Sequence, residues 1–387
     1  MPDSEANISI PDASVTDVPI AGVVFFFCAM LTLVLLGGCS TDSSNGAMFG
    51  ADVQRTGVFP PGGPTTIDGA AWSFQTDEAV GASPVMSGGT VYVGSGDGSL
   101  YAIDTETEQG QWQGQWVFET GGWLSSTAVS GGTVYVGSHD NHLYAIDATT
   151  GEEQWVFETG DLVTSSPAAY GGTVYVGSYD NHLYAIDAET GQEQWAFETD
   201  DLVASSPAVS GGTVYVGSDD NHLYAVDAET GEEQWAFETD EAVGSSPAMS
   251  GGTVYVGSSD GSLYAVDAET GEEQWAFETG DWVFSSPAVY GGTVYVGSYD
   301  NHLYAIDAAT GEEQWAFETD GPLQSSPAVS GSTIYVGSDD NHLYAIDAAT
   351  GQEQWVFETG DLVASSPAVS GATVYVGSAD GHLYAVE

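Results

Sequence analysis

Residues 165–204 read SSPAAYGGTVYVGSYDNHLYAIDAETGQEQWAFETDDLVA, and this stretch recurs, with few changes, along most of the chain. It contains four short segments with the composition of β-strands: SPAAY, TVYVGS, HLYAID and EQWAFET. The pairs Gly-Gly, Asp-Asn and Thr-Gly separate these segments, and such pairs favour tight turns. One copy of the repeat therefore predicts four antiparallel strands.

The copies follow one another at a fixed distance, which is marked by the Gly-Ser pair after the second predicted strand. From Gly137 onward the spacing is 40 residues, whereas the first copy carries an insertion after Asp104. A period of about 40 residues with four strands is typical of the blades of a β-propeller, so eight blades are predicted. The glycines that mark the eight copies are Gly94, Gly137, Gly177, Gly217, Gly257, Gly297, Gly337 and Gly377.

The order of the strands predicts how the ring closes. The chain ends at Glu387, after a strand of the third type, and the first strand of the repeat region, around Trp72, is of the fourth type. We therefore expect the Trp72 strand to complete the last blade, so that no sheet edge stays open. The predicted fold is all-β: an eight-bladed propeller of four-stranded antiparallel blades over residues 68–387.

The charge of the chain excludes several functions. Its 387 residues include 57 Asp and Glu but a single Lys or Arg, which gives a formal net charge of −56. One cation, Arg55, cannot neutralise a run of phosphates, so binding of nucleic acid or of anionic lipid through a basic patch is excluded. Carboxylates repel one another unless salt screens them, and this composition resembles that of proteins from extreme halophiles. An acidic calcium-binding surface in an ordinary organism is the alternative.

An apolar segment, residues 18–38, precedes the repeats, and its length of about 20 residues suits an export signal or a membrane span. Residues 36–39 read LGGC and resemble a lipobox with Cys39 as the lipid attachment site. No Lys or Arg precedes the segment, so a retained membrane anchor stays the alternative. We expect residues 1–39 to be the signal or anchor and residues 40–67 to be a polar tether and lead-in. The propeller would then lie on the cell surface, anchored to the cytoplasmic membrane from outside.

The repeats also carry the motif A-x-D-x-x-T-G-x-x-x-W, which is intact six times. It resembles the tryptophan-docking motif of pyrroloquinoline-quinone (PQQ)-type propellers, and MFGAD at residues 48–52, followed by RTG at 55–57, resembles the lead-in of PQQ-like repeat proteins. The resemblance covers roughly residues 48–387 and implies that each Trp covers the junction to the neighbouring blade. The six tryptophans with this structural role are Trp155, Trp195, Trp235, Trp275, Trp315 and Trp355.

This resemblance implies two functional classes: PQQ-dependent dehydrogenases, and binding scaffolds such as the BamB-like lipoproteins. The dehydrogenases hold their tricarboxylate cofactor with basic side chains and use a calcium ion, a catalytic Asp and in many cases adjacent cysteines. Here no basic residue follows Arg55 and no cysteine follows Cys39, so we expect no PQQ, no calcium and no catalytic residue. We predict a non-catalytic cell-surface binding scaffold. A quinoprotein dehydrogenase and a surface binder of cations or polymers are the alternatives.

Differences between the repeats concentrate in the connection from each fourth strand to the next blade and at the residue before the Asp-Asn turn. In a propeller both places lie on one face, and we expect this face of a monomeric ring to bind a protein or an envelope component. Neutral variation of solvent-exposed loops is the alternative. The candidate binding residues are Trp123, Tyr179, Trp282, Phe284, Tyr299 and Gln324.

Six of the seven histidines share one position in the repeat, just after the Asp-Asn or Asp-Gly turn. They predict either a ring of metal or anion contacts or a polar residue that flanks each turn. We favour the second interpretation, because neighbouring copies in a ring of eight would lie too far apart to share a metal. These histidines are His142, His182, His222, His302, His342 and His382.

Overall fold

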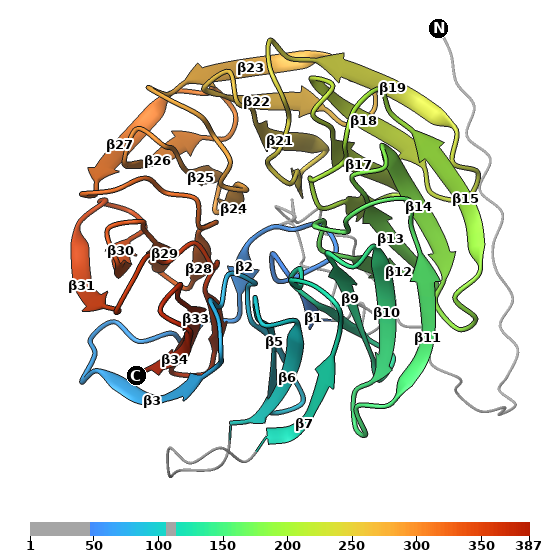
Figure 1. The fold of residues 1–387 in the computed structure, drawn as a ribbon. Helices are drawn as coiled ribbons and strands as arrows, with labels where there is room; N and C mark the ends of the chain where they lie inside the picture. The colour runs from blue at the N-terminus through green and yellow to red at the C-terminus, as the bar shows by residue number, and fades with distance from the viewer. Residues whose placement is uncertain (1–46, 106–113) are drawn as a thin grey trace, which may run out of the picture. The chain divides into compact units, whose positions relative to one another are not determined.

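The computed structural model describes residues 47–105 and 114–387, and these residues form a ring of eight antiparallel β-sheets (Figure 1). Each sheet is one blade, with its shortest strand nearest the axis of the ring and its Trp-bearing strand outermost. The predicted all-β, eight-bladed propeller is thus confirmed. No helix in the part of the chain that the structure describes is long and apolar enough to cross a membrane.

The first four blades run in chain order, each from the inner to the outer strand. Blade 1 consists of β4 (Val85–Ser87), β5 (Thr90–Gly94), β6 (Ser99–Asp104) and β7 (Gly114–Glu119). Blade 2 consists of β8 (Ala128–Ser130), β9 (Thr133–Ser138), β10 (His142–Asp147) and β11 (Glu153–Glu158). Blade 3 consists of β12 (Ala168–Tyr170), β13 (Thr173–Gly177), β14 (His182–Asp187) and β15 (Glu193–Glu198). Blade 4 consists of β16 (Ala208–Ser210), β17 (Thr213–Gly217), β18 (His222–Asp227) and β19 (Glu233–Glu238).

The remaining blades repeat this order, except that the last one takes its outer strand from the start of the chain. Blade 5 consists of β20 (Ala248–Ser250), β21 (Thr253–Gly257), β22 (Ser262–Asp267) and β23 (Glu273–Glu278). Blade 6 consists of β24 (Ala288–Tyr290), β25 (Thr293–Gly297), β26 (His302–Asp307) and β27 (Glu313–Glu318). Blade 7 consists of β28 (Ala328–Ser330), β29 (Thr333–Gly337), β30 (His342–Asp347) and β31 (Glu353–Glu358). Blade 8 consists of β32 (Ala368–Ser370), β33 (Thr373–Gly377), β34 (His382–Val386) and β3 (Ala70–Gln75).

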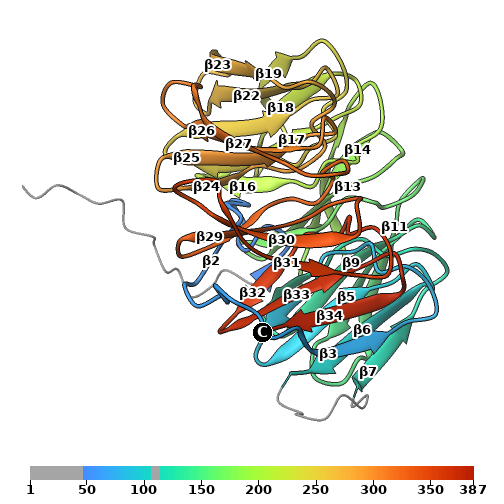
Figure 2. The same cartoon turned by 90° about the vertical axis from the view of Figure 1, so that its left-hand side faces the viewer.

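The ring closes at blade 8 as the strand order predicts. Strand β3 pairs antiparallel with β34, so that Trp72 lies opposite Ala385 and Phe74 opposite Leu383. The N–H of Asp68 also donates to the carbonyl oxygen of Glu387 (2.9 Å). Figure 2 shows β33, β34 and β3 side by side. Because both ends of the repeat region share one sheet, the closure leaves no exposed edge between the first and last blades.

The second strand of each blade is buried on both faces, because neighbouring blades pack against it. In β13 the residues Thr173–Gly177 are all buried, which explains the continuous apolar run TVYVG. The turn that follows needs a residue with positive φ, and Asn181 adopts a φ of 70° there. Blades 1, 5 and 8 place a glycine at the same point. The Asp-Asn and Asp-Gly pairs are therefore explained by backbone conformation.

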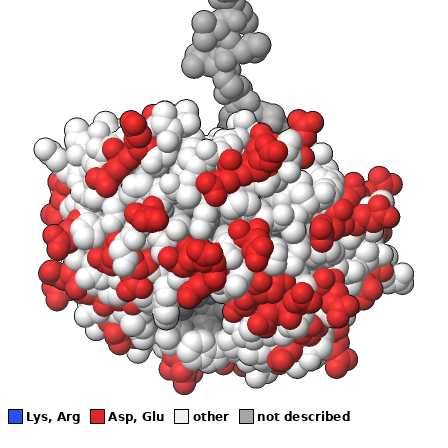
Figure 3. All heavy atoms as spheres, turned by 90° about the horizontal axis from the view of Figure 1, so that it is seen from above, with Lys and Arg blue, Asp and Glu red and all other residues white. Residues whose placement is uncertain are grey.

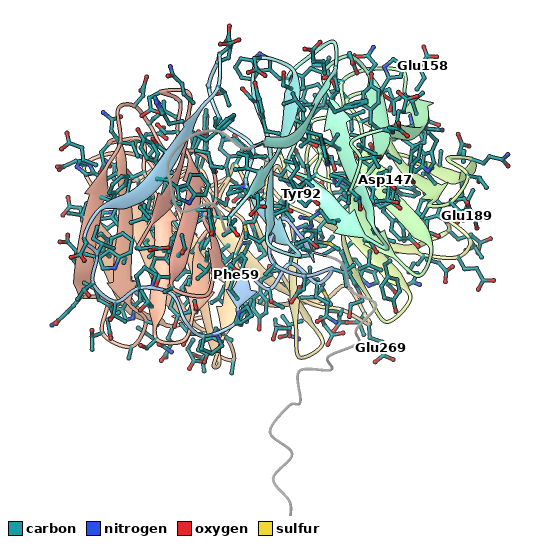
Figure 4. All side chains as sticks on the ribbon, turned by 90° about the horizontal axis from the view of Figure 1, so that it is seen from below. Phe59, Tyr92, Asp147, Glu158, Glu189 and Glu269 are labelled. Atoms are coloured by element: carbon teal, nitrogen blue, oxygen red, sulfur yellow. The ribbon has the colours of Figure 1, made fainter. Side chains whose placement is uncertain are left out.

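We name the two faces of the ring by their loops. The upper face carries the turns between second and third strands and the connections between blades; the lower face carries the Gly-Gly turns and the Thr-Gly turns. With the ring axis upright in Figure 4, Glu158 projects near the upper face and Glu269 near the lower face. Apart from the insertion after Asp104 in blade 1, the loops have nearly constant lengths, so differences between blades lie mainly in side chains.

The repeated tryptophan joins each blade to the next. The indole N–H of Trp155, in blade 2, donates to the carbonyl oxygen of Ala188 in blade 3 (3.0 Å), and the hydroxyl of Tyr135 reaches the same oxygen (3.4 Å). The turn under the indole is fixed by Asp187, whose carboxylate accepts hydrogen bonds from the backbone and hydroxyl of Thr190 (2.8 Å each). Asp, Thr, Gly and Trp of the motif thus build one interface between blades.

At blade 7 another segment supplies the acceptor, because the outer strand of blade 8 is β3 and no Thr-Gly turn joins it to β34. The indole N–H of Trp355 and the hydroxyl of Tyr335 both donate to the carbonyl oxygen of Pro64 (3.0 and 2.9 Å). The segment before β3 therefore replaces a turn that every other intact motif finds in the next blade.

The motif glycine gives a direct test of this interface. A methyl group at Gly231 would come within 2.7 Å of the Trp195 ring, and its φ of +72° is strained for any other residue. Gly211→Ala is the matched control, because Gly211 has a similar φ of +61° but open space around its added methyl. We expect Gly211→Ala to cost about 1 kcal/mol of unfolding free energy, and Gly231→Ala to cost about 2 kcal/mol more. Equal losses in urea unfolding would contradict the contact between Trp195 and the turn.

Candidate functional site

The axis of the propeller is occupied by the segment before β3. Strand β1 (Ala47–Met48) pairs antiparallel with β8, and β2 (Val58–Phe59) pairs in parallel with β28. Residues 47–67, which belong to the predicted tether and lead-in, pair with the blades. Their carbonyl groups satisfy N–H groups of inner strands that face the axis. The hydrogen bonds run from Val209 N to Val53 O, Met249 N to Gln54 O, Val289 N to Thr56 O, and Val329 N to Gly57 O (2.8–2.9 Å).

Arg55, the only basic residue of the chain apart from histidine, lies at the centre of this segment and is 2% exposed. Its guanidinium group donates to four backbone carbonyl oxygens: Pro207 (2.7 Å), Phe49 (2.9 Å), Ser166 (2.9 Å) and Pro167 (3.4 Å). The guanidinium carbon also lies 5.1 Å from the centroid of the Phe49 ring. The guanidinium of Arg55 is therefore already bound to groups of the protein itself.

Burial affects both charged groups of this axial segment. It lowers the pKa of Arg55, and the charge of Asp52 acts in the opposite direction. Burial also raises the pKa of Asp52, although hydrogen bonds from Thr56 and Gln54 and the charge of Arg55 oppose that rise. The Asp52 carboxylate accepts from the Thr56 hydroxyl (2.7 Å), which fixes the turn that presents Arg55 to the blades.

A small cavity of about 20 Å³ lies beside the axial segment, lined by Phe49, Arg55, Phe59 and the Ser-Pro pairs of blades 1, 6, 7 and 8. That volume holds about one water molecule. The lining offers a single cation whose donors are already used. These residues therefore do not fit a tricarboxylate quinone. The Ser-Ser-Pro segments use their hydroxyls for structure, as where Ser165 accepts from Gly177 N (3.1 Å).

On the upper face, one backbone hydrogen bond recurs in every blade and places the variable residues side by side. The residue before the Asp of the turn donates its N–H to a carbonyl of the connection between blades. The residue pairs joined in this way differ in chemistry although their backbone is the same. They are Gly96 and Ala79, His139 and Trp123, Tyr179 and Leu162, Asp219 and Leu202, Ser259 and Ala242, Tyr299 and Trp282, Asp339 and Pro322, and Ala379 and Leu362.

The structure brings three of the predicted binding residues together in blade 6. The ring centroids of Trp282 and Tyr299 lie 5.8 Å apart, those of Trp282 and Phe284 5.5 Å, and those of Phe284 and Tyr299 5.4 Å. Trp282 is 47% exposed. Burial raises the pKa of Tyr299 to about 12, and the charges of Asp339 and Asp281 add to that rise. We call Trp282, Phe284 and Tyr299 the blade 6 aromatic cluster.

The other predicted binding residues lie in different blades of the same face. Trp123 is 55% exposed and stacks on His139 with a centroid distance of 6.2 Å; burial lowers the pKa of His139. Gln324 donates from its side-chain amide to Asp339 (2.8 Å), whose pKa burial raises. Tyr179 occupies the corresponding position of blade 3. All six candidate residues therefore lie on the upper face, but they do not form one contiguous site.

Next to the blade 6 aromatic cluster lies an open hollow of about 470 Å³. Trp282 forms part of its wall, and four residues with carboxylates also line it: Asp240, Glu241, Asp260 and Asp281. Asp240 and Glu241 are not among the binding residues predicted from the sequence. A signal was present, because Glu241 stands where four other repeats have Asp.

The six repeated histidines lie beside the turn aspartates. His182 Nδ1 lies 2.8 Å from the carbonyl oxygen of Asp180, and the Asp180 carboxylate accepts from the Tyr184 hydroxyl (2.8 Å). Burial, with this hydrogen bond, raises the pKa of Tyr184. Within residues 47–105 and 114–387 no group of three or more His, Cys, Asp or Glu is placed to hold a metal ion. The predicted lipid attachment site, Cys39, lies outside the described residues.

Sequence families match two parts of the chain. A family described as "Outer membrane protein assembly factor BamB" matches residues 68–126 and 280–387, and one described as "Beta-alanine-activating enzyme, beta-propeller" matches residues 122–293. A comparison with curated proteins gives no significant match.

Solved structures share the fold at low sequence identity. BamB from Moraxella catarrhalis is 21% identical with a TM-score of 0.70, over 81% of this chain and 96% of that protein. The quinohemoprotein alcohol dehydrogenase ADHIIG from Pseudomonas putida is 17% identical with a TM-score of 0.76, over 89% and 80%. A computationally designed protein is 19% identical with a TM-score of 0.74, over 82% and 99%. The structural neighbours thus include BamB, an alcohol dehydrogenase and a designed protein.

Proposed function

Because the chain folds as a PQQ-like β-propeller, we propose that it is a non-catalytic scaffold that binds a protein or another envelope component through its upper face. The observation that carries this proposal is the constant backbone hydrogen bond of the upper face, which holds a different pair of side chains in most of the blades. A rigid ring that varies only in such side chains can recognise a surface without moving.

The axial segment supports a binding function over a dehydrogenase. In this chain the axis is filled by residues 47–59, and the guanidinium of Arg55 is bound to backbone carbonyls. A trianionic quinone placed in a protein of net charge −56 would have no free Lys or Arg to neutralise it. Blades 3 to 8 are also nearly identical in sequence, whereas a single catalytic centre requires one side of the ring to differ from the others.

We further propose that the propeller lies on the cell surface, anchored through the segment that ends at Cys39. Two features support this location: the apolar run at residues 18–38, and the match of the blades to a family named for outer-membrane assembly.

The proposal is tested by affinity capture from a native membrane extract at high salt. We expect the full-length protein to retain a defined set of proteins, and a Trp123→Ala, Trp282→Ala, Phe284→Ala variant to lose them. The matched control replaces Leu202 and Leu362 with Ala, since both occupy the Trp282 position and their partners, Asp219 and Ala379, are not aromatic. Identical capture by both variants, or reduction of a dye with alcohol or sugar after addition of PQQ and calcium, would contradict a non-catalytic scaffold.

A further inference from the structure

We propose that the hollow beside the blade 6 aromatic cluster binds an arginine side chain presented by the partner protein. This inference rests on the proposed scaffold function and adds the chemistry of the partner. Three features of the hollow support it: the exposed aromatic ring, the carboxylates around it, and a lining that includes no Lys, Arg or His.

The aromatic cluster provides a flat surface of defined orientation. The Trp282 ring makes interplanar angles of 72° with Phe284 and 52° with Tyr299. These two partly buried rings support the indole, while nearly half of Trp282 stays exposed. The backbone of Trp282 is held as well, since its N–H donates to the Asp281 carboxylate (2.8 Å) and its carbonyl accepts from Tyr299 N (2.9 Å). An indole held in this way loses little conformational entropy on binding.

The carboxylates of the hollow differ in how far the protein already uses them. Asp260 accepts from Ser262 N and the Tyr264 hydroxyl (2.8 and 2.9 Å), so it is a structural residue of the turn. The carboxylates of Asp240 and Glu241 are exposed and accept no hydrogen bond from any residue that the structure describes. Two free carboxylates beside an indole suit a planar cation that stacks and donates at once.

These features favour arginine over other ligands. The guanidinium is planar and weakly hydrated, and it stacks on aromatic rings while donating to carboxylates, whereas a lysine ammonium is a compact, strongly hydrated charge. A metal ion would make no use of the indole. A neutral sugar could stack on Trp282 but would leave the repulsion among the carboxylates unrelieved. A bound guanidinium reduces this repulsion, because its positive charge lies between the carboxylates.

Blade 4 offers a control with the same backbone. Leu202 stands there where Trp282 stands in blade 6, and the acidic residues Asp200 and Asp201 precede it. General attraction of cations to an acidic surface would act at both places. The aromatic ring is present only in blade 6, so dependence of binding on Trp282 but not on Leu202 isolates the proposed site.

The test is fluorescence anisotropy of labelled peptides with the full-length protein, at the lowest salt at which its circular dichroism is native. The probes are Gly-Arg-Arg-Gly, Gly-Lys-Lys-Gly and Gly-Gln-Gln-Gly, each capped at both ends. We expect the arginine peptide to bind most tightly. Trp282→Ala should weaken its binding by about fivefold and bring it to the level of the lysine peptide. Asp240→Asn with Glu241→Gln should weaken it comparably, and Leu202→Ala should leave it unchanged.

Several results would overturn the inference. Equal affinities for the arginine and lysine peptides, unaffected by Trp282→Ala, would reduce the effect to general charge attraction. Equal binding of the glutamine peptide, or Trp282-dependent binding of maltodextrin, would show that the hollow takes neutral ligands. If no peptide bound but capture from the membrane extract succeeded, the proposed scaffold function would stand. Only the proposal that the hollow binds arginine would then be wrong.

Discussion

Arg55→Met is expected to lower the free energy of unfolding by about 3 to 5 kcal/mol. The substitution leaves the carbonyl oxygens of Phe49, Ser166 and Pro207 buried and without their donor, while a side chain of similar length still fills the axis. The positive φ of residue 55 (53°) is retained, so backbone strain is the same before and after. Chemical unfolding at constant salt measures the difference.

The control for this prediction is Gln54→Met. Gln54 belongs to the same segment and its carbonyl accepts from Met249, but its side chain is exposed. We expect that control to change the unfolding free energy by less than about 0.5 kcal/mol. A loss at Arg55 no larger than at Gln54 would show that the axial segment contributes little to the stability of the ring.

The second large effect is expected from salt. In about 0.1 M KCl the protein should unfold at a temperature lower by on the order of 10 °C or more than in about 3 M KCl. The acidic side chains are spread over the surface shown in Figure 3, with no basic side chain among them. Their repulsion therefore acts over the whole ring, and it is screened once the Debye length falls to about 3 Å or less.

Thermal melting followed by circular dichroism over a series of KCl concentrations makes this measurement. Sucrose at matched osmolality serves as the control, because it favours compact states without screening charge. Equal melting temperatures at low and high salt would contradict adaptation to a saline environment. If sucrose raised the melting temperature as much as KCl does, the effect would come from solvent exclusion and not from screening of charge.

Much of the fold could be predicted from the sequence, because each blade is specified by local features. The Asp-Asn and Asp-Gly pairs mark backbone positions that need positive φ, and the uninterrupted TVYVG run marks a strand covered on both faces. Closure through Trp72 followed from counting strand types. These features repeat eight times, so an ambiguity in one copy is resolved by the others.

The axial segment could not be predicted in the same way. Residues 47–67 occur once, and their partners are backbone N–H groups of distant inner strands, which no side-chain pattern reveals. The pairing of Pro64 with Trp355 likewise replaces a Thr-Gly turn that blade 8 lacks, because its outer strand is β3. On the upper face the sequence indicated which positions vary. Only the structure shows that Trp282, Phe284 and Tyr299 meet, and that Asp240 and Glu241 border them.

The position of the axial segment has a consequence for the order in which the chain can fold during synthesis. Residues 47–59, which are made before the blades, bind inner strands of blades 4 to 7, and β3 can pair only after β34 has been made. Blades 1 to 7 can each form from consecutive residues as they leave the ribosome. The ring itself can close only once β34 is present, so a chain interrupted before β34 would expose both an unfilled centre and two free sheet edges.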